Sequence, residues 1–64
     1  MAMYVAVVGT GVRAGEWATR FLASGYDVVA NDSTVADVVT TCWPLADRMG
    51  LFPGASPDRL RISD

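Results

Sequence analysis

Residues 5–14 read VAVVGTGVRA, an apolar run that passes into a glycine-rich turn. The run is rich in β-branched residues and has no polar alternation, which is typical of a strand buried on both faces of a parallel sheet. Gly9 permits a tight turn from strand to helix, and Gly11 has no Cβ, so an anionic group can approach the backbone closely. Ala14 is small enough for the next helix to pack close to the strand. The stretch therefore predicts a strand, a turn and a helix whose N-terminus can face a phosphate group.

An amphipathic helix is predicted after this turn. Its apolar residues recur with the spacing of one helical face, at Ala14, Trp17, Ala18, Phe21 and Leu22. This spacing predicts that Trp17 is a core residue and that Glu16, Thr19 and Arg20 lie off the apolar face. Gly25 is expected to end the helix in the left-handed conformation.

A second strand is predicted over residues 27–31, and a second helix follows it. The apolar face of that helix is predicted at Val35, Val38, Val39, Cys42, Leu45, Ala46 and Met49. Ser33 is the predicted N-cap, and Gly50 the predicted end. Pro44 lacks an N–H group and crowds the preceding turn, which predicts either a kink or two short helices.

A third strand is predicted near the end of the chain. Ser56 and Pro57 suit the cap and first position of a short helical turn. The alternating residues 59–62 indicate a half-exposed edge strand, whose Arg59 and Arg61 we interpret as protection against edge pairing.

The element order is therefore β-α-β-α-β, which predicts an α/β fold of the partial Rossmann type. Right-handed connections give a three-stranded parallel sheet of order 3-2-1, with both helices on one face. The other face of the strand at residues 3–8 then has no cover, so we expect residues 1–64 to be part of a larger domain.

Composition excludes several functional classes. The net charge of −2 argues against nucleic acid and anionic membranes as partners. The chain has no His, the commonest general acid or base at neutral pH. Its single Cys42, expected to be a small core residue, excludes an internal disulfide and a multi-cysteine metal site. The first residues carry no basic segment and the apolar run stops at Gly9, which predicts a cytoplasmic protein without a signal peptide or membrane span.

Asp32 supplies the second half of a nucleotide-binding pattern. It closes the second predicted strand, 21 residues after Gly11. At that position an acidic residue binds the ribose 2′-OH of NAD, and it can cap the next helix as well. The predicted cofactor-binding residues are Gly9, Thr10, Gly11, Val12, Arg13, Ala14 and Asp32. The alternative interpretation of Arg13 is a solvated residue in the first helical turn. No set of catalytic or metal-binding residues can be assembled from the sequence.

Two segments resemble the start of the NAD-dependent 3-hydroxyacyl-CoA dehydrogenases, most closely their L-carnitine dehydrogenase branch. They are residues 9–32 and residues 43–61, and the second is the more discriminating. The resemblance implies an oxidoreductase of fatty acid metabolism that oxidises a 3-hydroxy group of an acyl-CoA or of carnitine with NAD. It also implies that the catalytic His and the substrate domain lie outside this incomplete domain, so that this chain alone is expected to transfer no hydride. Independently of the resemblance, the uncovered apolar face of the first strand favours homo-oligomerisation or aggregation.

Two departures from this family bear on function. Glu16 stands where the family has Gly, and we expect its carboxylate to hinder pyrophosphate binding from the first helical turn. The stretch from Asp32 to Trp43 is about six residues shorter than in the family, which is not a whole number of helical turns. Three alternatives remain open: a non-enzymatic nucleotide-binding module, an inactive gene remnant and an S-adenosylmethionine methyltransferase. The methyltransferase lacks support, because no acidic residue precedes the glycines.

Overall fold

Strands and helices alternate along the chain in the predicted order. The computed structural model describes residues 4–9 and 11–63. The elements are β1 (Tyr4–Val7), α1 (Gly11–Ala23), β2 (Asp27–Ala30), α2 (Thr34–Met49), the 3-10 turn η1 (Pro57–Arg59) and β3 (Leu60–Ile62). The α/β class and the β-α-β-α-β order are therefore confirmed.

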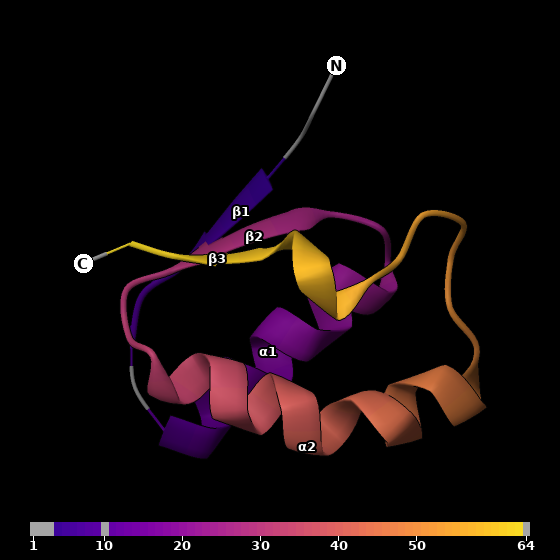
Figure 1. Ribbon diagram of the computed structural model, residues 1–64, viewed down its shortest axis with the longest axis horizontal. Coiled ribbons are helices and arrows are strands. Elements are labelled where there is room, and N and C mark those ends of the chain that lie inside the picture. Colours follow the sequence, from indigo (N-terminus) through magenta and orange to yellow (C-terminus); the bar gives the residue numbers. More distant parts are fainter. Residues whose placement is uncertain (1–3, 10, 64) are drawn as a thin grey trace.

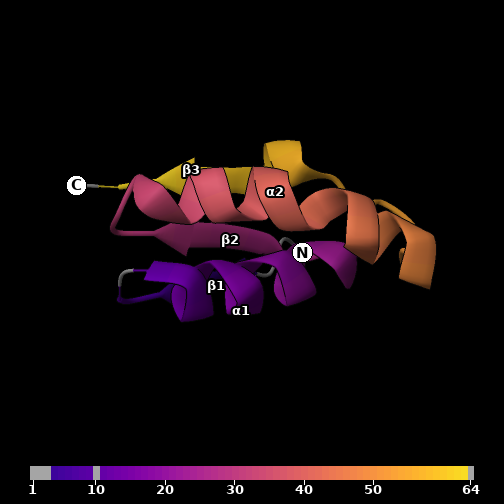
Figure 2. The same cartoon turned by 90° about the horizontal axis from the view of Figure 1, so that it is seen from below.

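The three strands form one parallel sheet with β2 in the centre. Its order is β1-β2-β3, which is the predicted 3-2-1 arrangement. Val28 of β2 pairs with Val5 of β1 and with Leu60 of β3. Both helices lie on the same side of the sheet, α1 under β1 and β2, and α2 under β2 and β3 (Figures 1 and 2). One face is thus covered by helices, as the right-handed connections require.

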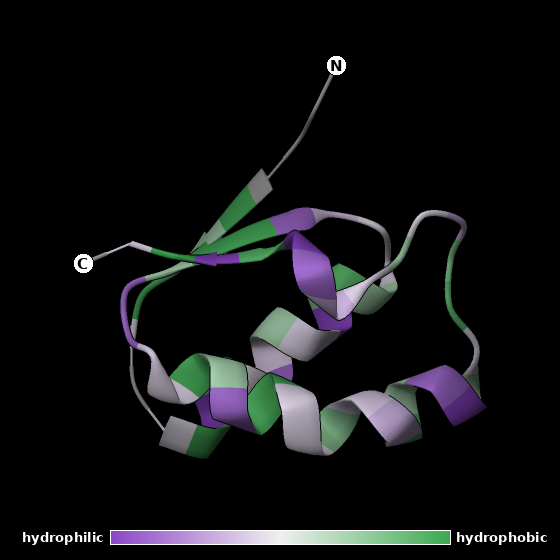
Figure 3. Cartoon of the chain, viewed as in Figure 1, coloured by the Kyte–Doolittle hydropathy of each residue, from purple (hydrophilic) through white to green (hydrophobic). Residues whose placement is uncertain are grey.

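The core lies between the sheet and the two helices. Its buried apolar residues are Val7, Ala14, Ala18, Leu22, Val28, Ala30, Val35 and Val39. Along β2, Val28 and Ala30 are buried, whereas Asp27 and Val29, which alternate with them, are only half-buried. Figure 3 shows the apolar residues gathered along the strands and the mixed polarity of both helices. The sheet face opposite the helices therefore has no helix against it in the described part of the chain.

The buried face of α1 differs from the predicted one. Ala14, Ala18 and Leu22 are buried as expected, but the other buried residues are Gly15 and Thr19 rather than Trp17 and Phe21. At 3.6 residues per turn the buried face is rotated by roughly 60° from the predicted stripe. The cause is α2, which packs beside α1 and covers the small residues on that side.

Trp17 is correspondingly a surface residue, and the prediction that it lies in the core is wrong. Its side chain is 50% exposed. It stacks on Phe21 with 6.1 Å between ring centroids, and the Arg20 guanidinium lies 5.6 Å from its ring centre. Trp17 therefore belongs to the open side of α1, beside the free edge of β1.

The C-terminal ends of α1 and α2 agree with the sequence, but the buried face of α2 does not. Gly25 has φ +90° and Gly50 has φ +105°, so glycine ends both helices in the left-handed region. Pro44 lies inside a single continuous α2, so of the two predicted outcomes the pair of short helices is wrong, and the kink stays a prediction. Leu45 and Met49, predicted on the apolar face, are 61% and 81% exposed. The first half of α2 supplies its buried residues.

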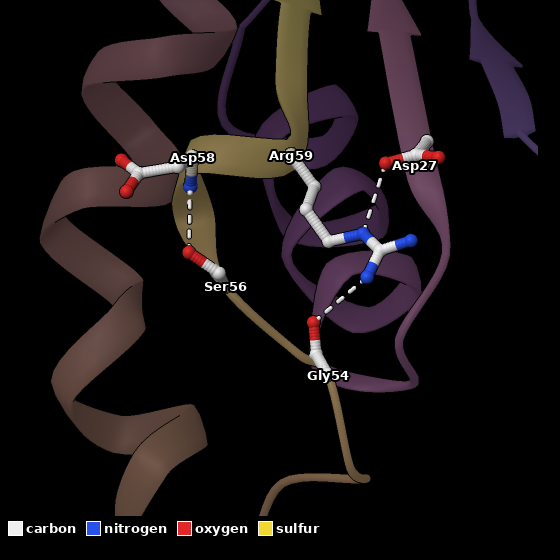
Figure 4. A network of polar contacts seen from close by, with 5 residues as sticks. All are labelled: Asp27, Gly54, Ser56, Asp58 and Arg59. Atoms are coloured by element: carbon white, nitrogen blue, oxygen red, sulfur yellow. Dashed lines mark hydrogen bonds and ion pairs between the residues drawn. The ribbon is translucent and has the colours of Figure 1, made fainter.

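Arg59 joins three segments at the end of the sheet where β2 and β3 begin (Figure 4). Its Nε donates to Asp27 Oδ1 at 2.9 Å, and its NH1 group donates to the Gly54 carbonyl at 3.0 Å. Ser56 caps η1 by accepting from the Asp58 N–H at 3.1 Å, as predicted. Arg59 thus precedes β3 and fastens the loop to β2, so its interpretation as an edge-protecting residue is wrong, while Arg61 is exposed on β3.

Two further features concern the described residues only. No helix in residues 4–9 and 11–63 has the length and apolar character needed to cross a membrane. In the same residues, no three side chains of His, Cys, Asp or Glu come together as metal ligands do. Cys42 is a free thiol, half-buried on α2.

Candidate functional site

The parallel sheet brings the predicted nucleotide-binding residues to one edge. Val7 at the end of β1 pairs with Ala30 at the end of β2, so the turn at Gly9 and the carboxylate of Asp32 follow neighbouring strand ends. Both helices also begin on this side of the molecule (Figure 1). Ligands of open α/β sheets bind at the carboxyl ends of the strands, which makes this edge the candidate site. Thr10, which was predicted to belong to it, lies outside the described residues.

The glycine turn has the backbone shape that the sequence required. Gly9 has φ +139° and Gly11 has φ +86°, conformations that side-chain-bearing residues rarely adopt. Apart from its chain neighbours and the backbone of its own helix, a Cβ placed on Gly11 would meet no atom of the described residues within 4 Å, so the space in front of this residue is open. A Cβ on Gly9 would lie 3.9 Å from the Ala14 Cβ, which shows how closely the buried Ala14 approaches the turn. The turn is therefore a cradle that a ligand can approach closely at Gly11.

Helix α1 starts at the second glycine of the turn, Gly11. Gly11, Val12 and Arg13 thus form its first turn, and all three are exposed. The first N–H groups of a helix have no partner within the helix, and the helix dipole adds positive potential there. This end of α1 can bind an anion such as a pyrophosphate.

A hollow lies beside the turn, along the free edge of β1. It has a volume of about 400 Å³ and is lined by Ala6, Val7, Val8, Gly9, Arg13, Ala14, Trp17 and Phe21. Arg13 is its charged member and comes from the first turn of α1. Its guanidinium lies beside the N-terminus of α1, where a phosphate group is expected, and a guanidinium can donate hydrogen bonds to phosphate oxygens.

Asp32 uses one carboxylate oxygen to begin α2. Its Oδ1 accepts hydrogen bonds from Thr34 Oγ1 at 2.7 Å and from the Thr34 N–H at 2.8 Å. These two bonds stabilise the ionised carboxylate and hold the pKa of Asp32 below its ordinary value of 3.8, with the hydroxyl bond contributing most. Ser33 stands at the N-cap position but its side chain makes no capping bond; Asp32 makes that bond, which confirms the prediction that Asp32 can cap this helix. Oδ2 of Asp32 accepts no hydrogen bond from the described residues, and so one acceptor remains for a ribose hydroxyl.

Asn31 is a residue of this edge that the sequence pattern did not reveal. Its Oδ1 accepts a hydrogen bond from the Gly9 N–H at 3.1 Å, across 22 residues of chain. The only signal in the sequence is its position directly before Asp32 at a strand end. A tie between the glycine turn and the neighbouring strand cannot be read from local periodicity, because it depends on how two strands pair.

Glu16 lies farther along α1 than expected. Because α1 begins at Gly11, Glu16 is its sixth residue and belongs to the second turn, not the first. Its exposed side chain shares a shallow hollow with Arg13, Trp17 and Arg20. The carboxylate is therefore displaced from the helix N-terminus and neighboured by two arginines, which weakens the expected interference with a pyrophosphate.

Sequence comparison identifies relatives among the L-carnitine dehydrogenases. The enzyme of Streptomyces griseus is 45% identical over 65 residues, which cover 92% of this chain and 19% of the relative. The chain is similar to the N-terminal fifth of L-carnitine dehydrogenases. The Bacillus cereus enzyme is 45% identical over 62 residues, covering 88% of this chain and 19% of the relative. The Pseudomonas putida enzyme is 42% identical over 63 residues, covering 89% and 20%.

The chain spans about one fifth of the length of these relatives. No family model matches it, and no solved structure matches it. The alignment with the Streptomyces griseus enzyme has 65 positions, but 92% of this chain is only about 59 residues. This chain is therefore about six residues shorter than the relative over the aligned stretch, which agrees with the shortening predicted from the sequence. In this structure Ser33 alone separates Asp32 from α2, so the second helix follows the candidate site directly.

Proposed function

We propose that this chain binds NAD as the nucleotide-binding part of an oxidoreductase similar to L-carnitine dehydrogenases. The observation that carries the proposal is the open turn at Gly11, which begins α1 and lies at the same sheet edge as the carboxylate of Asp32. The sequence similarity supports the class of enzyme. A cradle that accepts close approach, a helix N-terminus and an acidic strand end are the three parts that a dinucleotide site requires.

Each residue has a defined task in this proposal. The N–H groups at the start of α1 and the guanidinium of Arg13 hold the pyrophosphate, with Val12 and Ala14 setting the course of the first turn. Thr10 stays a predicted member of this site. Oδ2 of Asp32 accepts from the ribose 2′-OH. NAD, when bound, supplies the hydride acceptor for oxidation of a 3-hydroxy group of carnitine or of an acyl-CoA. The base and the substrate-binding groups would come from sequence that corresponds to the rest of the relatives.

The experiment is a calorimetric titration of the chain with NAD and with NADP. We expect tighter binding of NAD, by about five- to tenfold, because a 2′-phosphate would place a like charge about 4 Å from the Asp32 carboxylate in a solvated site. Asp32→Asn should narrow this difference. Asn is also a good N-cap, so the start of α2 is preserved in this variant.

The matched control is Asp37→Asn, which removes one exposed carboxylate from the first turn of α2 away from Asp32. It should leave the NAD preference unchanged. Equal affinity of the parent chain for NAD and NADP would remove Asp32 from the ribose site. Absence of binding to either cofactor by a folded chain would contradict the proposal and favour a gene remnant.

A further inference from the structure

We propose that Asn31 is a positioning residue that holds the glycine turn in its nucleotide-binding shape. This inference rests on the proposed NAD binding and adds a residue that the dinucleotide pattern does not contain. The observation is the hydrogen bond from the Gly9 N–H to Asn31 Oδ1, 3.1 Å long, which links the turn after β1 to the residue after β2.

The turn needs such a tie because two of its residues are glycines. Gly9 and Gly11 both have positive φ, and glycine reaches many other conformations at little energetic cost. A turn that sampled those conformations would have to be ordered when a ligand binds, and that ordering would weaken affinity. A hydrogen bond that fixes Gly9 before binding removes part of this entropic penalty.

Asn31 is well placed to act as the fixed partner. It follows Ala30, which pairs with Val7 of β1 on one side, while the Ala30 carbonyl accepts from the Ser63 N–H at 2.8 Å on the other. The end of β2 is thus held from both neighbouring strands. The hydrogen bond from the Gly9 N–H to Asn31 Oδ1 ties the turn to this fixed strand end, whereas on the open side of β1 no described strand lies beside it.

Asn31 and Asp32 together connect the end of β2 to the starts of both helices. Asn31 accepts from Gly9 in the turn that leads into α1, and Asp32 accepts from Thr34 in the first turn of α2. The division of charge suits an anionic ligand. A neutral amide oxygen lies next to the turn where the phosphates are expected, and the carboxylate lies one residue farther along, where a ribose is expected.

The experiment combines amide hydrogen exchange at Gly9, followed by NMR, with calorimetric titration of NAD into the same chain. Asn31→Leu keeps similar side-chain size and removes the acceptor. Asn31→Asp keeps an acceptor and adds a negative charge. Ser24→Ala is the matched control, because it removes another exposed side-chain bond to the backbone, from Ser24 Oγ to the Arg20 carbonyl, at the opposite end of α1.

We expect Asn31→Leu to speed exchange of the Gly9 amide and to raise the dissociation constant for NAD by about three- to tenfold, the effect of one hydrogen bond. Asn31→Asp should restore protection of the Gly9 amide but not the affinity, because its charge repels the pyrophosphate. Ser24→Ala should change neither quantity.

Two results would overturn the inference. One is unchanged Gly9 exchange in Asn31→Leu, which would show that the bond does not hold the turn. The other is equal loss of affinity in Ser24→Ala, which would show that any destabilisation of α1 suffices. Failure of the parent chain to bind NAD would instead defeat the proposed function, and the exchange measurement would still decide whether Asn31 fixes the turn.

Discussion

At the scale of single residues, the two oxygens of Asp32 separate a structural task from a binding task. Oδ1 accepts from the hydroxyl and the N–H of Thr34, whereas Oδ2 has no partner among the described residues. The carboxylate is therefore already oriented by the protein before a ligand arrives, which reduces the conformational entropy lost on binding. Because Oδ1 is hydrogen-bonded to the first turn of α2, loss of the Asp32 charge affects both α2 and the candidate site.

The lowered pKa of Asp32 gives a pH-dependent stability with a defined direction. Because the folded-state pKa lies below the ordinary value of 3.8, the carboxylate stabilises the fold fully above that value. The contribution is lost as pH falls through the lower, folded-state pKa. We expect the thermal midpoint of the parent chain to drop more steeply than that of Asp32→Asn as the pH falls below 3.8.

Thr34→Val isolates the cause of this shift. It removes the hydroxyl donor and keeps the backbone donor, so the pKa of Asp32, read from its carboxyl carbon by NMR, should rise toward 3.8 without reaching it. Thr40→Val, which removes a hydroxyl bonded to the Ala36 carbonyl farther along α2, is the matched control. An Asp32 pKa that does not respond to Thr34→Val would assign the shift to another source.

At the scale of elements, the sequence predicted strand order and helix count better than helix orientation. The β-branched run before Gly9, the glycine turn and the acidic end of β2 are local signals, and right-handed crossovers then leave one arrangement of the sheet. Which face of α1 is buried depends on α2, whose residues lie 20 or more positions further along the chain. Hydrophobic periodicity cannot distinguish a helix face that packs against another helix from an apolar face that stays exposed. The periodicity of α1 therefore predicts a buried Trp17 and gives no signal for the buried Gly15.

Gly15 is the residue that sets the distance between α1 and α2. A Cβ placed there would lie 2.3 Å from both the Cβ and Cγ1 of Val38, closer than atoms can approach. Thr19, one turn later, is also buried and directs its hydroxyl to the Gly15 carbonyl at 2.8 Å. The missing side chain of Gly15 and the hydrogen bond of Thr19 to its own helix backbone thus allow the two helices to pack in close contact.

We predict that Gly15→Ala destabilises the fold by about 1–3 kcal/mol, the usual result of overpacking, even though Ala is the better helix former. Val38→Ala should not fully rescue it, because the Val38 Cβ is itself one of the clashing atoms. Glu16→Ala, at the exposed neighbouring position, is the matched control. Urea unfolding followed by circular dichroism measures all four chains, and an equal or higher stability of Gly15→Ala would show that the helices can separate without cost.

At the scale of the whole molecule, the two edges of the sheet differ in protection. On the β3 edge, Arg61 lies in the middle of the strand, and it is charged and exposed. Residues 4–8 along β1 carry no charge, and Val8 is 83% exposed. Exposed strand edges without charge tend to pair with other chains. The apolar hollow that Trp17 and Phe21 line lies along this same unprotected edge.

We therefore predict that the chain associates with itself through the β1 edge at micromolar to millimolar concentration. Val8→Lys places a charge on that edge and should lower the average mass measured by light scattering toward that of a monomer, because burying an unpaired ammonium in a strand contact is costly. Met49→Lys is the matched control, since Met49 is equally exposed, at 81%, but lies at the far end of α2. If the parent chain is monomeric at every concentration, or if Met49→Lys disperses it as effectively as Val8→Lys, then the free edge of β1 is not the surface through which copies meet.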